Sequence, residues 1–169
     1  YGDRFGSYQQ PGPMARRVEV LYLLLKVIAG PDQLDASVSP VPLKDPAEVN
    51  LADLRIAYYT TNDMADPIPE IKKMVIDSAN KLSSEVSSVT EARPPVLNEL
   101  TKKRQELNSA DGKAHLKRLV LQNGTKVTSP NLNISGEVLS AMEYGKLVEE
   151  LDSLKSQMLQ FMGDYDILL

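Results

Sequence analysis

The stretch Leu54-Arg55-Ile56-Ala57-Tyr58-Tyr59-Thr60 decides the fold, because its β-branched and aromatic residues predict a strand. Pro69 and Glu70 then mark the start of a helix, whose spacing is carried by four positions: Ile71, Val75, Ser78 and Leu82. Residues 85–92 predict a second strand, although its serines make the pattern weaker, and two prolines end it. Strand, helix and strand form a βαβ unit, so the two strands are expected to run parallel with a right-handed crossover.

The segment before this unit predicts a loop, a helix and a long connection. Residues 1–13 are rich in Gly and Pro, which is typical of a loop. A helix is predicted from five apolar positions that step by four and three: Met14, Val18, Leu21, Leu25 and Ile28. It is apolar almost all round, as in helices that are buried in a larger structure, and Gly30-Pro31 ends it. Residues 31–53 carry prolines and aspartates without a period, which predicts an extended connection.

The segment after the unit predicts mostly helix, at about residues 96–108, 111–122 and 136–162. The last of these carries the spacing four, three, four, three at Leu147, Leu151, Leu154, Met158 and Phe161. Gly163 ends it, and Tyr165-Asp166-Ile167-Leu168-Leu169 predicts the start of a strand. The expected fold class is therefore α/β: a mixed sheet with a βαβ unit, covered by several helices.

Composition excludes several kinds of site. The chain has 169 residues, a net charge of −4, no Cys and a single His, His115. Disulfides, thiol nucleophiles, Cys-ligated metals and His-rich metal sites are therefore excluded, and no cofactor is expected. The acidic balance gives no reason to expect nucleic acid as a partner. The most apolar stretch, Val20 to Ala29, is interrupted by Lys26 and is too short for a membrane span. It is not placed as a signal peptide, so a cytoplasmic location is expected.

Three groups of polar residues could carry chemistry, and each also has an ordinary structural explanation. His115 has Asp111 four residues earlier on the same helix face, but a surface or half-buried helical His is the expected role. Asp32 and Asp35 could bind a cation or share catalytic work, although Asp in a Pro-containing loop more often caps backbone N–H groups. A basic run could contact phosphates, and the solvated face of two helices explains it better: Lys102, Lys103, Arg104, Lys113, Lys117 and Arg118.

Short motifs give no catalytic site either. Asn123-Gly124-Thr125 and Asn133-Ile134-Ser135 match the glycosylation pattern, which we interpret as chance in a chain without a secretory signal. Gly2, Gly6 and Gly12 do not follow a strand, as a dinucleotide motif or P-loop requires. No Gly-x-Ser-x-Gly elbow is present. No catalytic, cofactor-binding or metal-ligating residue is therefore predicted.

A resemblance runs over nearly the whole chain. Several stretches, in order and spacing, resemble the part of the amidase signature family that follows its Gly/Ser-rich signature. These are Gly12-Pro13-Met14-Ala15-Arg16-Arg17-Val18-Glu19, Val27-Ile28-Ala29-Gly30-Pro31-Asp32, Leu34-Asp35, Val41-Pro42-Leu43, Leu54-Arg55-Ile56-Ala57, Pro69-Glu70-Ile71, Glu91-Ala92-Arg93-Pro94-Pro95, Phe161-Met162 and Tyr165-Asp166-Ile167-Leu168-Leu169. The chain departs from the family at two places. Val20 stands where the family usually carries an acidic residue after Glu19, and the stretch Ser83 to Ser88 is more polar than the family's strand there.

The resemblance implies amide hydrolysis by a Ser–cis-Ser–Lys triad, in which a Gly-rich loop holds the oxyanion. No position here matches the family's Lys or its Gly/Ser-rich signature, so no catalytic residue is carried over. From this and from the Tyr1 start and Leu169 finish, residues 1–169 are expected to be part of a larger amidase-type α/β domain. The expected partners are an amide substrate and an N-terminal part of the same protein, with a homodimer left open. The alternative is a self-contained, non-catalytic α/β interaction module.

Overall fold

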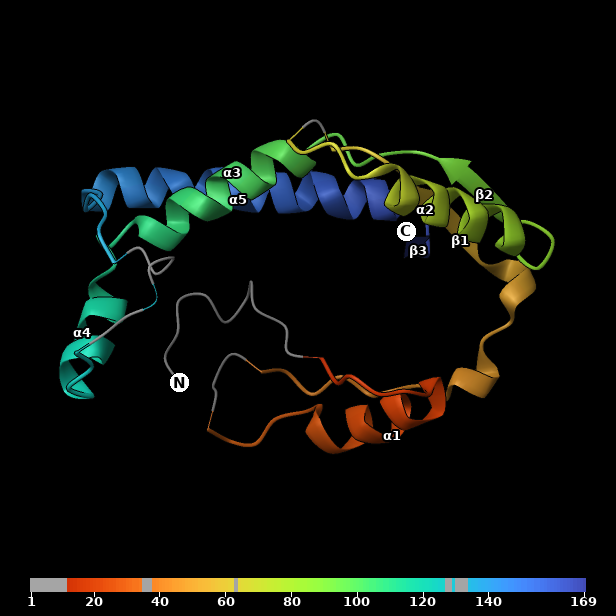
Figure 1. The fold of residues 1–169 in the computed structure, drawn as a ribbon, viewed down its shortest axis with the longest axis horizontal. Helices are drawn as coiled ribbons and strands as arrows, with labels where there is room; N and C mark the ends of the chain where they lie inside the picture. Colours follow the sequence, from red (N-terminus) through yellow and green to blue (C-terminus); the bar gives the residue numbers. More distant parts are fainter. Residues whose placement is uncertain (1–11, 35–37, 63, 127–128, 130–133) are drawn as a thin grey trace. The chain divides into compact units, whose positions relative to one another are not determined.

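The structure, a computed structural model, describes residues 12–34, 38–62, 64–126, 129 and 134–169. The chain divides into two compact units, Tyr1–Val49 and Asn50–Leu169. The second unit combines a parallel sheet with helices, so the predicted α/β class is confirmed (Figure 1).

A three-stranded sheet organises the second unit. Its middle strand is β1 (Arg55–Tyr58), with β2 (Ser88–Glu91) on one side and β3 (Ile167–Leu168) on the other. Both neighbours run parallel to β1. Ile56 of β1 is paired with Val89 of β2 on one side and with Ile167 of β3 on the other. The parallel pairing predicted for the first two strands is confirmed. The sequence predicts a mixed sheet, but these strands are all parallel, because helices form the connections between them.

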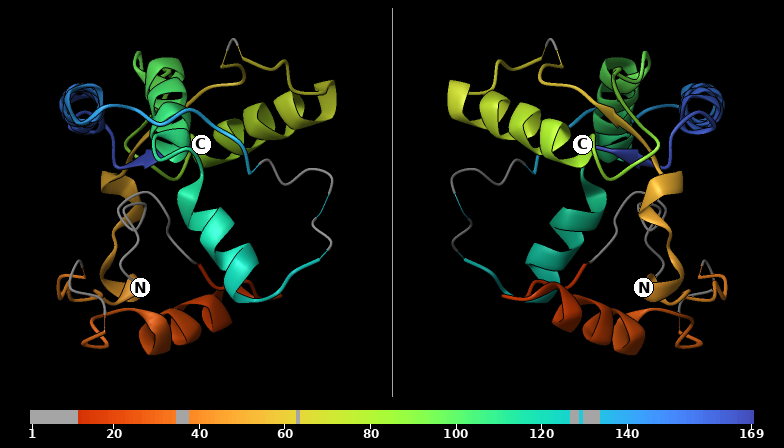
Figure 2. Two further views of the ribbon diagram at one scale, coloured as in Figure 1. Left: turned by 90° about the vertical axis from the view of Figure 1, so that its left-hand side faces the viewer. Right: turned by 90° about the vertical axis from the view of Figure 1, so that its right-hand side faces the viewer.

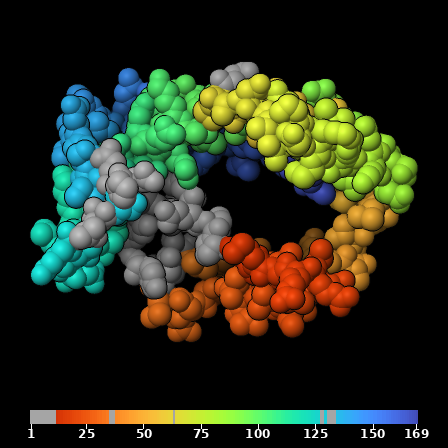
Figure 3. Space-filling view, in the orientation of Figure 1, coloured from red at the N-terminus to blue at the C-terminus, as the bar shows by residue number. Residues whose placement is uncertain are grey.

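Helix α2 (Pro69–Leu82) connects β1 to β2 and packs on both strands. Pro69 stands in its first turn, where the missing N–H of proline costs nothing. The residue that α2 buries is Ala79, whose small side chain lets the helix come close to the sheet. In Figure 3 the yellow-green atoms of α2 form part of the surface of this unit. The helix predicted between the two strands is therefore confirmed.

Helices α3 (Leu97–Ser109) and α5 (Ala141–Met162) pack against each other and supply a further part of the core. Figure 2 shows them side by side, α3 in green and α5 in blue. Leu107 on α3 and Leu147 and Leu151 on α5 are buried, which confirms the apolar spacing of the sequence.

The long C-terminal helix and the one before it begin later than predicted, each for a local reason. A capping box sets the start of α5: the Ser140 side chain accepts from the Glu143 N–H, and the Glu143 side chain accepts from the Ser140 N–H. Helix α4 (Ala114–Gln122) cannot begin at residue 111, because Gly112 and Lys113 have φ values of +63° and +62°.

The first unit contains α1 (Val18–Ile28) and a 3₁₀ turn, η2 (Pro46–Glu48). Helix α1 starts four residues later than the predicted Met14, since Arg17 is extended and two arginines at a helix start oppose its dipole. None of its residues is buried, so the expected burial of this apolar helix does not occur in the unit itself. The predicted loop over residues 1–13 lies outside the described residues, apart from 12 and 13.

The connection predicted as extended contains two short helical turns. Asp45 accepts a hydrogen bond from the Ala47 N–H at 2.9 Å and caps η2. Asn50 Nδ2 donates to Asp53 Oδ2 at 2.8 Å beside the second turn, η3 (Leu51–Asp53), which lies in the second unit. Asp and Asn favour such turns because their side chains bond to nearby backbone groups.

A close backbone approach fixes the joint between α3 and α4. Segment 135–139 crosses the turn after α3: Leu139 N donates to Ala110 O at 2.9 Å, and Asp111 forms a bridge with Val138. A Cβ on Gly112 would stand 2.9 Å from Val138 Cγ2 and 3.0 Å from Gly136 O. Glycine is thus required here both by its backbone angle and by the space available.

We therefore predict that Gly112→Ala destabilises the protein by about 1–3 kcal/mol more than Gly124→Ala does. Both glycines have positive φ, but a Cβ on Gly124 meets nothing within 4 Å, so the backbone cost is matched and the clash is not. Urea unfolding of the two variants measures the difference. Equal losses of unfolding free energy in the two variants would contradict this prediction, because they would show that the chain near residues 112 and 136 can move to make room for a Cβ.

Candidate functional site

The carboxyl ends of the parallel strands meet at one edge of the sheet, which we call the carboxyl edge. After β1, Tyr59 N donates to Leu169 O at 3.3 Å, and Ala92 N donates to Tyr58 O at 2.9 Å. Residues that follow all three strands are therefore held together by backbone hydrogen bonds. In open α/β sheets, ligands bind outside the carboxyl ends, where the connections leave in different directions. This edge is the first candidate site.

The loop after β1 borders a hollow of about 270 Å³, lined by Thr61, Met64, Ala65 and Asp66. Asn62 Oδ1 accepts from the N–H groups of Met64 and Ala65, both at 3.1 Å. Lys72 of α2 forms an ion pair with Asp66. The loop is thus attached to the helix behind it, and it presents a methionine and small residues at the carboxyl edge.

At the opposite edge, the most extensive polar contact of the sheet joins Arg55 and Asp166; we call it the Arg55–Asp166 clamp. Asp166 Oδ2 accepts from Arg55 N at 2.8 Å and from Arg55 Nε at 3.1 Å, while Oδ1 accepts from Nη2 at 3.1 Å. Arg55 Nη1 also donates to Gly163 O, at 3.1 Å. The clamp therefore links β1, the end of α5 and the start of β3.

The clamp shifts the pKa values of both partners. Hydrogen bonds from the Arg55 side chain and backbone hold the pKa of Asp166 below its usual 3.8. The bond to Asp166 raises the pKa of Arg55, with added effects of the Asp166 and Asp164 charges and an opposing effect of burial. Both groups are therefore charged over the whole neutral range. The sequence does not predict this pair. Both residues stand in stretches that resemble the family, but 111 positions separate them and nothing in either stretch points to the other.

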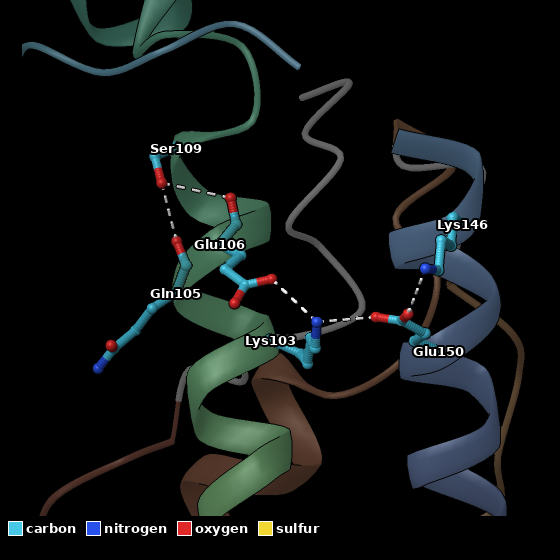
Figure 4. Close-up of polar contacts among 6 residues, drawn as sticks. All are labelled: Lys103, Gln105, Glu106, Ser109, Lys146 and Glu150. Atoms are coloured by element: carbon cyan, nitrogen blue, oxygen red, sulfur yellow. Dashed lines mark hydrogen bonds and ion pairs between the residues drawn. The ribbon is translucent and has the colours of Figure 1, made fainter. Parts of the chain in front are cut away.

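A second polar group bridges α3 and α5; we call it the Lys103 bridge. Lys103 Nζ lies 2.8 Å from Glu150 Oε2 and 3.2 Å from Glu106 Oε2, and Lys146 Nζ lies 3.8 Å from Glu150 Oε1 (Figure 4). It borders a shallow hollow of about 290 Å³, lined by Glu99, Lys103, Glu150, Ser153 and Leu154. The sequence groups Lys103 with the basic run, but this lysine is paired and its side chain is only 20% exposed.

The bridge also shifts pKa values. The hydrogen bonds to Glu150 and then to Glu106 raise the pKa of Lys103 above its usual 10.5. In return, the hydrogen bond from Lys103 holds the pKa of Glu150 below its usual 4.5. A charged lysine is a poor base or nucleophile, so this arrangement stabilises the helix pair and does not prepare Lys103 for catalysis.

The structure places the predicted candidates in structural roles. His115 is half-buried, as expected, and its Nδ1 lies 3.2 Å from Arg118 Nη2. Asp111 accepts from the backbone N–H of His115 at 3.2 Å. This bond caps the start of α4 and does not involve the imidazole of His115. Asp32 accepts from the Leu34 N–H at 2.8 Å, which confirms a turn role, while Asp35 lies outside the described residues.

The remaining candidates agree with their ordinary explanations where they are described. Lys102, Arg104, Lys117 and Arg118 are exposed, and Lys113 donates to Asn108 O at 2.9 Å. Asn123 Nδ2 donates to Leu119 O at 2.8 Å within its own helix end, whereas Asn133, Gly2 and Gly6 lie outside the described residues. In the part of the chain that the structure covers, no three His, Asp or Glu side chains gather as metal ligands. The described helices include none with the length and apolar character that a membrane span needs.

Comparisons with known proteins agree on one family. A family model described as Amidase matches residues 2–169. Fatty-acid amide hydrolase 1 of Sus scrofa is 32% identical over 75 residues, which are 43% of this chain and 13% of that protein. Vitamin D3 hydroxylase-associated protein of Gallus gallus is 29% identical over 111 residues, 62% of this chain and 23% of that protein.

Two further matches extend this result. A glutamyl-tRNA(Gln) amidotransferase polypeptide of Saccharolobus solfataricus is 34% identical over 98 residues, 54% of this chain and 20% of that protein. The solved structure of a fatty acid amide hydrolase superposes with a TM-score of 0.73 and 22% identity, covering 89% of this chain and 28% of that one. The chain thus matches less than a third of the length of each of these proteins, and the structural match supports the fold.

We predict that Lys103→Met lowers the stability of the protein more than Lys73→Met does. Lys103 joins two helices, whereas the pair of Lys73 with Asp77 at 2.6 Å stays within α2. Without the ammonium group, Glu106 and Glu150 also lose their shared counter-charge. Urea midpoints at neutral pH compare the two variants, and equal midpoints would contradict a bridging role.

The same pair predicts a pH dependence. Because the pKa of Glu150 is lowered in the folded state, its contribution is present above the unfolded value near 4.5 and is lost as the pH falls through the folded value. The pKa of Lys103 is raised, so its contribution is present below 10.5 and is lost as the pH rises through its folded value. Lys103→Met should therefore reduce the loss of stability at acid pH and also the loss at alkaline pH. Urea midpoints measured across the pH range check both effects.

Proposed function

We propose that this chain, which belongs to the amidase family, is part of a hydrolase of carboxylic acid amides and supplies scaffold and one wall of its substrate pocket. The observation that carries the proposal is the family match, which runs from residue 2 to residue 169. Two of the matched relatives carry amide hydrolase or amidotransferase activity in their names. The alternative of a self-contained, non-catalytic interaction module stays a prediction, which the activity measurement below tests.

The proposed reaction is cleavage of an amide C–N bond by a serine nucleophile. The serine oxygen bonds to the carbonyl carbon, the C–N bond breaks as a proton passes to the leaving amine, and water then releases the acid. A second serine and a lysine would carry the proton, and backbone N–H groups would hold the oxyanion. We place these groups outside residues 1–169, because no position in this sequence matches the motif that holds them.

The carboxyl edge is the surface that we assign to the pocket wall. It brings Tyr59 and Leu169 together by a hydrogen bond and borders the hollow at Thr61 and Met64. Its position outside the ends of parallel strands is where open α/β folds bind small molecules. Met64 is 51% exposed, so the wall offers apolar as well as polar contact to an amide substrate.

Helix α1 supports the second part of the proposal, which is that other parts of the same protein cover this chain. Leu23 is 62% exposed and Val27 is 78% exposed, although both lie in a helix that is apolar almost all round. Such a helix is stable when an apolar surface covers it. The N-terminal part of the amidase domain is the partner we propose. The cytoplasmic location and the homodimer raised by the sequence stay predictions.

We predict that residues 1–169 alone hydrolyse neither a simple aryl amide nor a fatty amide, because the nucleophile and base lie elsewhere in the protein. The measurement is release of amine or acid, with a serine-directed covalent inhibitor as a parallel probe. The full protein containing this region is the positive control and should show both turnover and labelling. Turnover together with covalent labelling of the isolated chain would refute the proposal.

We also predict that residues 1–169 alone bind a hydrophobic dye through α1. The double substitution Leu23→Glu and Val27→Glu should reduce the dye fluorescence severalfold, since charged side chains then interrupt the apolar face. Lys26→Gln is the matched control, because it changes a polar residue of the same helix. The same pair of glutamates should lower the stability of the full protein, whereas no effect there would mean that nothing covers α1.

A further inference from the structure

The weakest part of the sheet is the attachment of β3. This strand has two residues, and its register with β1 consists of Ile56 opposite Ile167 and Ala57 opposite Leu168. A pairing this short contributes few ladder hydrogen bonds. It also closes a loop of more than a hundred residues, which carries a conformational entropy cost. Something other than the ladder must therefore hold β3 in place.

The apolar pattern of β3 does not define its register. Residues 167–169 read Ile-Leu-Leu, so a shift by one residue would place Leu168 opposite Ile56 and Leu169 opposite Ala57. Each position along β1 would still face an apolar residue. A strand normally keeps its register because a shift by one residue would expose apolar side chains and bury polar ones. For the shift that places Leu168 opposite Ile56, this free-energy cost is small, because the exchanged residues are all apolar.

The Arg55–Asp166 clamp supplies the missing discrimination. Arg55 is the first residue of β1, and Asp166 directly precedes β3. Besides the three bonds to its carboxylate, Asp166 donates its own N–H to Arg55 O at 2.8 Å. A shift by one residue would bring Ile167 to this place, where no carboxylate could accept from the guanidinium or from the Arg55 N–H. The shifted register thus loses all charge-assisted bonds at once.

Partial exposure does not remove this effect. The side chains of Arg55 and Asp166 are 42% and 37% exposed, and an ordinary surface ion pair at such a site contributes little. The clamp differs because both carboxylate oxygens are engaged by the planar guanidinium and one of them also accepts from the main chain. Bidentate geometry of this kind adds directional specificity to the attraction. The third guanidinium contact, to Gly163 O, fixes the end of α5 just before β3.

We infer that Arg55 and Asp166 are positioning residues that set the register of β3 against β1 and thereby place the carboxyl edge. The link to that edge is direct: Leu169 N donates to Ala57 O at 2.9 Å, and Leu169 O accepts from Tyr59 N at 3.3 Å. A shift of one residue at the clamp would move Leu169 by one residue along β1 and break both of these bonds. The consequence for substrate rests on the proposed function; the register itself does not.

Cysteine cross-linking tests the register, because the chain has no cysteine of its own. In the full protein, Ile56→Cys with Ile167→Cys reports the native pairing, and Ile56→Cys with Leu168→Cys reports the shifted one. We expect at least about a tenfold preference for the native disulfide, since partners in register point to the same face and shifted ones do not. Adding Asp166→Asn or Asp166→Ala should bring the two yields to within about threefold. Asp164→Asn is the matched control, because Asp164 acts on Arg55 through its charge and should leave the preference unchanged.

Kinetics of the full protein test the positioning role. We expect Asp166→Asn and Arg55→Lys to raise the KM for an amide substrate by about tenfold with a smaller change in kcat, because the wall has moved and the reacting groups have not. Simple loss of folded enzyme would lower the apparent kcat and leave KM unchanged. Arg55→Lys keeps the charge but not the bidentate contact, so it stays informative if Asp166→Ala fails to fold.

The outcomes separate the two proposals. An undiminished native cross-link in both Asp166 variants overturns the register assignment. A shifted register with an unchanged KM overturns the claim that this register places the carboxyl edge. A full protein that hydrolyses no amide, in which the cross-link preference nevertheless falls on replacing Asp166, refutes the proposed function and leaves the register assignment standing.

Discussion

The sheet of the second unit depends on the contact between Arg55 and Asp166. These residues are 111 positions apart, and the chain between them forms α2, β2, α3, α4 and α5 before it returns. The ladder of β3 is too short to repay that loop closure by itself. A bidentate pair that also engages the main chain gives the returning segment one orientation and one register. The end of α5 is included through Gly163 O, so helix, strand and sheet meet at a single arginine.

Local patterns predict most of the elements because their causes are local. The helical period places α2, α3 and α5, and Pro69 marks the start of α2. The true start of α5 is also written locally, as Ser140 followed by Glu143, but the apolar period extends the prediction past it. The start of α4 is not readable in the same way. Lys113 has a positive φ although it is not glycine, and it directly follows Gly112, which Gly136 and Val138 approach closely.

The contacts that join the elements could not be predicted, since they pair residues distant in sequence, and even some local pairs are open to two interpretations. Lys103 looks like one member of a basic run, yet its carboxylate partner Glu150 stands on another helix. Asp111 and His115 look like an acid–base pair at helical spacing, but the carboxylate caps the backbone instead. Spacing along one helix predicts which side chains share a face, and it does not decide whether a side chain bonds to a neighbour or to the main chain.

Each unit has an element whose surface the described residues leave exposed: strand β2 in one unit and helix α1 in the other. The same physical reason explains both exposures. Parallel sheets in α/β proteins are covered on both faces, yet in β2 the residues Ser88, Thr90 and Glu91 are exposed. In the other unit α1 buries none of its residues. Sheet edges and apolar helices of this kind are stable inside a larger α/β fold. The matched relatives are several times longer than the region they share with this chain, and a domain of that length, as proposed above, would be large enough to cover both surfaces.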